Sequence, residues 1–129
     1  MTEKECLVSV SSFTLFGPAR IKLLLSFFGS AKKVWNSDPK KLLKLGLGEE
    51  RTKNFIDYKE SFDPSSYFKK LHRLGIKYVA KEGEGYPQNL QEIDDAPFVL
   101  YYKGSLSVSD INSIAVVGSR KVTSYGREV

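Results

Sequence analysis

The chain has 129 residues, of which 41% are hydrophobic and 27% are charged, and both values are near the averages of soluble globular proteins. This composition argues against a wholly disordered chain and a collagen-like fibre. The apolar runs fall far short of the roughly 20 residues that a membrane-spanning helix needs, so we expect no membrane partner. The length suits one ordinary domain or two small ones, and it is too short for a complete doubly wound α/β enzyme.

The whole net charge of +5 lies in the first part of the chain. Residues 1–72 hold 13 Lys and Arg against 8 Asp and Glu, whereas residues 73–129 hold 7 of each. The basic excess suggests a polyanionic partner, and a solvated helical surface explains it equally well. With one cysteine, Cys6, and one histidine, His72, we expect no internal disulfide, metal or cofactor. The first residues lack the basic segment and apolar core of a secretory signal, so we expect a cytoplasmic protein.

Helix caps divide the first 75 residues into six short predicted helices. Thr2 and Glu5 form a capping box for the first helix. Proline at a first helical position and glycine after a last one mark most of the others. The predicted starts are Thr2, Gly17-Pro18, Ser30, Asp38-Pro39, Gly48 and Asp63-Pro64.

After Gly75 the hydrophobic period changes to that of strands. We predict strands over Ile76–Ala80, Phe98–Tyr102 and Ile114–Val117, with a weak helix over Gln88–Ile93 in a crossover between the first two. The fold class is therefore α/β. We expect a helical domain over residues 1–62 and an incomplete, mainly parallel sheet within residues 63–129.

Two glycine hairpins, Leu15–Arg20 and Leu45–Arg51, join short helices as in a helix-hairpin-helix unit. The amides that open the second helix of such a unit can hold a phosphate oxygen. The glycines could equally do no more than connect helices, and Glu49 and Glu50 occupy the place of a phosphate. Phe27, like other aromatic residues here, is predicted to pack in the core rather than to stack on bases. The candidate secondary contacts to a DNA backbone are Gly17, Arg20, Lys22, Gly46, Gly48, Arg51 and Lys53.

The strongest local motif runs from Ile114 to Gly126. A buried strand leads into Gly118, which allows close backbone approach to a ligand, and Thr123 or Ser124 can cap a following helix. Ser119 can donate a hydroxyl hydrogen bond, and Arg120 can make a bidentate contact with phosphate. The segment is neither a G-x-G-x-x-G fingerprint nor a Walker A loop, so a plain strand-to-helix turn stays open as the alternative.

The order and spacing of several motifs resemble the opening of the DprA/Smf family, DNA processing protein A. The helices from Phe13 to Phe55 are similar to the SAM-like amino-terminal domain of that family. The residues that carry the remaining resemblance are Gly85-Tyr86-Pro87, Leu90, Ile93, Asp94, Pro97, Leu100–Gly104, Val117–Arg120, Thr123, Tyr125 and Gly126.

The resemblance implies a non-catalytic protein with a Rossmann-like fold that binds single-stranded DNA, protects it during natural transformation and helps to load the recombinase RecA. In that family the Gly-Ser-Arg turn lines the DNA pocket, which implies contacts from Gly118, Ser119 and Arg120. Thr123, Tyr125 and Gly126 would shape the same segment. Because the family's further pocket residues and its dimer contacts lie downstream of this turn, we expect an amino-terminal fragment, with a homodimer only in the full-length protein.

Two other functions stay open at this point. The related Rossmann superfamily includes nucleotide-processing enzymes with a similar first loop, although no acidic residue here has a partnered base or metal cluster. Alternatively, the helical domain is a protein-interaction module, as SAM-like bundles often are.

Overall fold

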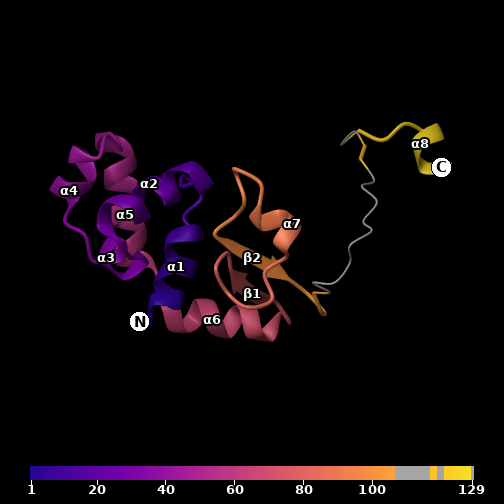
Figure 1. The fold of residues 1–129 in the computed structure, drawn as a ribbon, viewed down its shortest axis with the longest axis horizontal. Coiled ribbons are helices and arrows are strands. Elements are labelled where there is room, and N and C mark those ends of the chain that lie inside the picture. The colour runs from indigo at the N-terminus through magenta and orange to yellow at the C-terminus, as the bar shows by residue number, and fades with distance from the viewer. Residues whose placement is uncertain (107–116, 119–120, 129) are drawn as a thin grey trace.

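The computed structural model describes residues 1–106, 117–118 and 121–128. Six helices come first, a two-stranded sheet follows, and one short helix lies near the carboxyl end (Figure 1). The elements are α1 (Glu3–Ser11), α2 (Pro18–Phe28), α3 (Ala31–Trp35), α4 (Pro39–Lys44), α5 (Glu49–Ser61), α6 (Pro64–Arg73), β1 (Lys77–Ala80), α7 (Gln88–Gln91), β2 (Val99–Tyr102) and α8 (Tyr125–Glu128).

The six predicted helix starts are confirmed. At α1 the capping box is complete, because Thr2 Oγ1 accepts from Glu5 N at 3.2 Å and Glu5 Oε2 accepts from Thr2 N at 2.7 Å. Side-chain oxygens of Ser30, Asp38 and Asp63 accept from first-turn amides of α3, α4 and α6. Each cap satisfies an amide that has no partner within its helix, so these boundaries are decided locally.

The main core lies among α1 to α5. Phe55 of α5 is fully buried, with its ring centroid 5.3 Å from that of Phe13 and 4.8 Å from that of Phe16. Burial of such side chains contributes roughly 1.5–3 kcal/mol each. The buried members of this cluster are Val10, Phe13, Phe16, Ile21, Leu24, Val34, Leu42, Leu47 and Phe55.

The prediction that the aromatic side chains pack in this core is wrong for Phe27, which is 54% exposed. Helix α2 buries Ile21 and Leu24 and packs Leu25 and Phe28 partly against the core. These positions follow the i, i+3, i+4, i+7 spacing of one helix face. Phe27 lies off that face and projects into solvent.

The two strands form an antiparallel pair, so the prediction of a parallel sheet with a crossover is wrong for them. Val99 lies opposite Ala80 and Tyr102 lies opposite Lys77. Residues 81–98 form a wide loop whose ends meet, since Lys81 N donates to Phe98 O at 2.9 Å. Its only helix, α7, has four residues, which is too short to cover a sheet face as a parallel crossover does.

A row of aromatic side chains connects the helical part with the sheet. The ring centroid of Phe62 lies 5.5 Å from that of Trp35 and 5.2 Å from that of Tyr67. Tyr67 of α6 in turn shares a hydrogen bond of 3.1 Å with the hydroxyl of Tyr101 on β2. Phe62 thus packs on both sides of the predicted domain boundary, which stays a prediction.

Two expectations remain, one about the third predicted strand and one about membrane-spanning helices. The predicted strand Ile114–Val117 lies outside the described residues except for Val117. Among the described residues, every helix is too short or too polar to cross a bilayer.

Candidate nucleic-acid interface

The turn after the third predicted strand is described only in part. Gly118 is exposed, and a Cβ built there would meet no heavy atom within 4 Å. Val117 beside it is 89% exposed. Ser119 and Arg120, the two predicted phosphate ligands, lie outside the described residues.

The residues that follow this turn make the predicted helix cap. Thr123 Oγ1 accepts a hydrogen bond of 3.2 Å from Gly126 N at the start of α8. A Cβ at Gly126 would come within 3.4 Å of that same Thr123 oxygen. Tyr125 is 75% exposed, so its ring is available to a ligand. Thr123 and Gly126 therefore contact each other at the start of α8, and their role in shaping a DNA-binding segment stays a prediction.

The structure brings the two glycine hairpins together. Leu15 from the loop before α2 and Leu47 and Gly48 from the loop before α5 line one hollow of about 310 Å³. Gly46 and Gly48 have φ angles of 82° and 80°, a left-handed region that favours glycine. The tight second turn predicted from the glycines is therefore present.

The charges at this hollow oppose phosphate binding. Glu49 and Glu50 are exposed in the first turn of α5 and complement the positive end of that helix. Arg51 Nη1 donates to the backbone oxygen of Leu47 at 3.0 Å, so one edge of its guanidinium is already engaged. Arg20, Lys22 and Lys53 are exposed, whereas Arg51, the other basic residue of the predicted secondary set, is half-buried.

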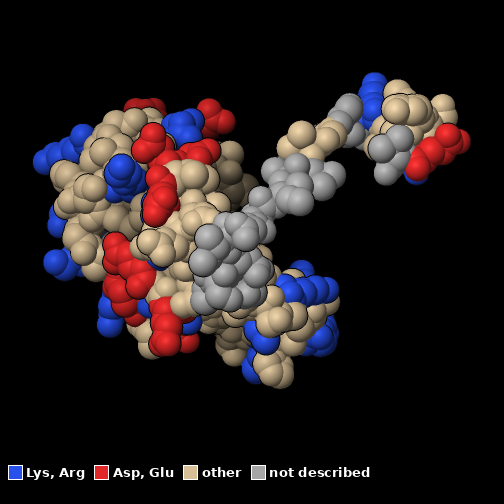
Figure 2. All heavy atoms as spheres, turned by 45° about the vertical axis from the view of Figure 1, so that its right-hand side comes forward, with Lys and Arg blue, Asp and Glu red and all other residues tan. Residues whose placement is uncertain are grey.

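A second hollow, which sequence reasoning missed, lies among α2, α3 and α4. We call it the basic hollow; it has a volume of about 650 Å³, and its charged and aromatic lining consists of Phe27, Phe28, Lys33, Asp38, Lys41 and Lys44. Lys and Arg atoms gather along the left edge of the helical part in Figure 2, whereas Asp and Glu atoms lie nearer the middle of that face. The signal available in the sequence was the lysine-rich stretch of residues 32–44, which reads as a solvated helix surface.

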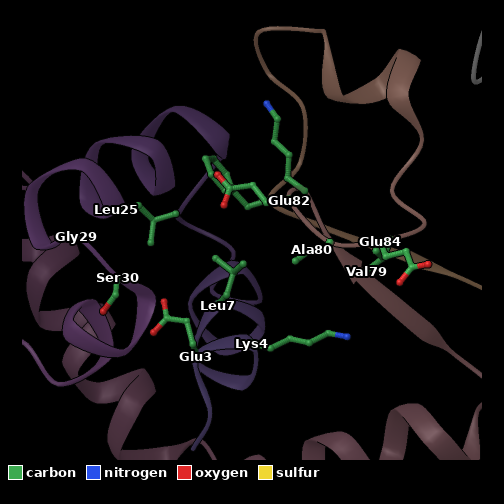
Figure 3. Close-up of a pocket in the computed structure, with 13 residues that line it drawn as sticks. Glu3, Lys4, Leu7, Leu25, Gly29, Ser30, Val79, Ala80, Glu82 and Glu84 are labelled. Atoms are coloured by element: carbon green, nitrogen blue, oxygen red, sulfur yellow. The ribbon is translucent and has the colours of Figure 1, made fainter.

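A third hollow, of about 640 Å³, lies where α1 and α2 face the turn after β1 (Figure 3). The carboxylate of Glu3 points toward α3, where it accepts from Ala31 N and, at 3.1 Å, from Lys32 N. Leu7, Leu25 and Val79 supply an apolar lining between the charged side chains. Because Glu3 already caps α3, it is not free for chemistry, and the other two acids of the lining, Glu82 and Glu84, lie in the turn after β1.

The perturbed ionisable groups have structural causes. Burial raises the pKa of the Cys6 thiol, which makes it less reactive. Burial lowers the pKa of Lys59, whose ammonium donates to the backbone oxygens of Trp35 at 2.9 Å and Ser37 at 3.2 Å. Burial also raises the pKa of Tyr101. Within the described residues, no cluster of His, Cys, Asp and Glu could hold a metal ion.

The chain is similar to known proteins over most of its length. A family model described as DNA recombination-mediator protein A matches residues 77–129. Protein Smf of Synechocystis is 27% identical over 115 residues, and DNA processing protein DprA of Streptococcus pneumoniae is 28% identical over 120 residues. Protein Smf of Borreliella burgdorferi is 42% identical over 55 residues. No solved structure matches the chain.

These matches cover most of this chain and a smaller part of each relative. They span 85% and 73% of this chain for the Synechocystis and S. pneumoniae proteins, and 29% and 43% of those proteins. The B. burgdorferi match spans 43% of this chain and 18% of that protein. The chain thus spans less than half the length of these curated relatives. The resemblance to the DprA/Smf family inferred from the residues is confirmed by these matches.

Proposed function

We propose that this chain is part of a non-catalytic protein of DNA processing that binds single-stranded DNA. The observation that carries the proposal is the family match over residues 77–129, which includes the turn at Gly118 and the capped segment up to Gly126. The names of the family and of the S. pneumoniae relative refer to DNA recombination and DNA processing.

The chemistry of this segment suits a sugar-phosphate backbone. Gly118 has no side chain to hinder a strand, and an added Cβ would meet only open space. The Arg120 guanidinium would pair with phosphate oxygens, the Ser119 hydroxyl would donate a hydrogen bond, and the exposed Tyr125 ring would offer a stacking surface. Contacts of this kind depend on salt and are nearly indifferent to base sequence.

The finer roles belong to the same proposal. The protein would protect single-stranded DNA during natural transformation in the cytoplasm, assist loading of the RecA recombinase, and form homodimers through residues beyond this turn. The proposal also includes a Rossmann-like fold for the second part of the chain. For the first part it includes a SAM-like, helix-hairpin-helix domain. The exposed side chains of Arg20, Lys22 and Lys53 would add backbone contacts.

The test measures oligothymidine affinity by fluorescence anisotropy on the full-length gene product at low salt. Arg120→Ala should weaken binding about tenfold or more, as expected when a charge-assisted hydrogen bond is lost. Arg127→Ala on α8 is the matched control and should change the affinity less than twofold. Equal affinities for wild type and Arg120→Ala would remove the assigned site. Displacement of the oligonucleotide by a mononucleotide would favour a nucleotide-processing enzyme instead.

A further inference from the structure

The basic hollow combines an exposed ring with three ammonium groups from two helices. Lys33 lies on α3, whereas Lys41 and Lys44 lie three residues apart on α4, on one side of that helix. Phe27 is the exposed aromatic residue at the end of α2. A single exposed apolar side chain is common on protein surfaces and does not by itself indicate a binding site. Here it shares a hollow of about 650 Å³ with the lysines.

The ring of Phe27 is supported in its position. Its centroid lies 4.9 Å from that of Phe28 with the two planes at 78°, an edge-on arrangement in which one ring holds the other. Phe28 itself packs partly against the main core. A ring held in this way can offer a face to a ligand with a smaller loss of conformational entropy than a freely rotating side chain.

The charges at the hollow favour an anion. The three lysines stand against one carboxylate, that of Asp38, which accepts from Lys40 N at 2.7 Å and so caps α4. The Lys33 ammonium lies beside Gly29 at the carboxyl end of α2, only 4.0 Å from where a Cβ on that glycine would be. The carboxyl end of a helix attracts cations, which favours this position of the Lys33 ammonium.

We infer that the basic hollow binds single-stranded nucleic acid, with a base stacked on Phe27 and the adjoining phosphates paired with Lys33, Lys41 and Lys44. An aromatic face beside several separate cations is the combination by which proteins hold single strands without reading their sequence. The inference adds a second contact surface, on the helical part, to the segment at Gly118. It rests on the proposed function in that the ligand is the same polymer.

The first experiment compares two triple variants of the full-length gene product. Lys33→Ala, Lys41→Ala and Lys44→Ala together should weaken oligothymidine binding about tenfold. They should also reduce the slope of log affinity against log salt by about 2, because each phosphate neutralised on a single strand contributes about 0.7. The control removes the same charge elsewhere, with Lys69→Ala, Lys70→Ala and Lys103→Ala, and should leave the slope nearly unchanged. Equal slopes for the two triples would overturn the inference.

The second experiment isolates stacking. Phe27→Ala should weaken binding of oligothymidine at least about fivefold and leave binding of an abasic oligomer of equal length unchanged. Equal losses on both oligomers, or binding of polyglutamate as tight as that of oligothymidine, would overturn the assignment. Urea denaturation of each variant checks that it is folded, since these side chains are exposed.

The two surfaces fail in distinguishable ways. Loss of binding in Arg120→Ala with no effect of the Lys33, Lys41 and Lys44 triple would overturn only the basic hollow. Loss of binding in the lysine triple with no effect of Arg120→Ala would support the basic hollow and overturn the assignment of the Gly118 segment. If the full-length gene product binds no oligothymidine at all, both assignments are overturned.

Discussion

The helical part, residues 1–62, and the β-hairpin, residues 77–102, are stabilised in different ways. The helices enclose a cluster centred on the fully buried Phe55. The hairpin has four buried apolar side chains of its own, Val79, Tyr86, Ala96 and Val99, and two strands of four residues. An isolated two-stranded hairpin is marginal in water. Its stability therefore depends on α1, α6 and the aromatic row that joins it to the helices.

The contact between the two regions is partly polar. The hydroxyls of Tyr67 and Tyr101 share a hydrogen bond, and the Lys4 ammonium lies 5.0 Å from the ring centroid of Tyr78 on β1. Within the hairpin, Tyr86 donates to the backbone oxygen of Pro97 at 2.8 Å and closes the wide loop. The helical part therefore has a buried core of its own, whereas the hairpin depends on contacts with its neighbours.

The largest effect should come from the core of the helical part. Phe55→Ala should lower the free energy of unfolding by about 3–5 kcal/mol, because it removes a fully buried ring and leaves a cavity. Hairpin order should be lost with it. Urea denaturation followed by circular dichroism measures this change. The control, Phe27→Ala, removes a half-exposed ring and should cost less than about 1 kcal/mol; a similar cost for both would contradict the description of the core.

A smaller effect is expected at the second hairpin of the helical part. Gly48 has φ 80° and ψ 157°, a conformation that is almost restricted to glycine. Gly48→Ala should therefore cost about 1–3 kcal/mol. The matched control is Gly17→Ala, since Gly17 has φ −80° and open space around its Cα, and its stability should be nearly unchanged. Thermal unfolding distinguishes the two, and equal melting temperatures would contradict the glycine-dependent turn.

The smallest effect concerns the contact between the regions at alkaline pH. Burial raises the pKa of Tyr101 above its ordinary value of 10.0, so its contribution to stability is complete below pH 10. That contribution is lost as the pH rises above 10, where the unfolded chain ionises first. In Tyr101→Phe the drop in unfolding free energy between pH 8 and pH 11 should be smaller than in wild type by less than about 1 kcal/mol, because the group is partly exposed. An unchanged drop would show that Tyr101 does not titrate as described.

The features of the candidate sites also differ in how far they could be predicted from the sequence. The helix-capping role of Thr123 and the tight turn at Gly46 and Gly48 were predictable, because each depends on residues close in sequence. The grouping of Phe27 with Lys33, Lys41 and Lys44 was not, because it depends on how three helices pack. The assignment of Ser119 and Arg120 stays a prediction, since both lie outside the described residues.

The amino-acid sequence alone determined the helix starts, the combination of helices with strands and the resemblance to the DprA/Smf family. Caps, N-terminal prolines and terminal glycines act through hydrogen bonds that span only a few residues, so they can be read along the chain. Tertiary structure alone decided that Val99 pairs antiparallel with Ala80 and that Phe27 faces solvent. Strand direction depends on how an 18-residue loop closes, from Lys81 to Phe98. The exposure of a ring depends on which face of its helix the other helices cover.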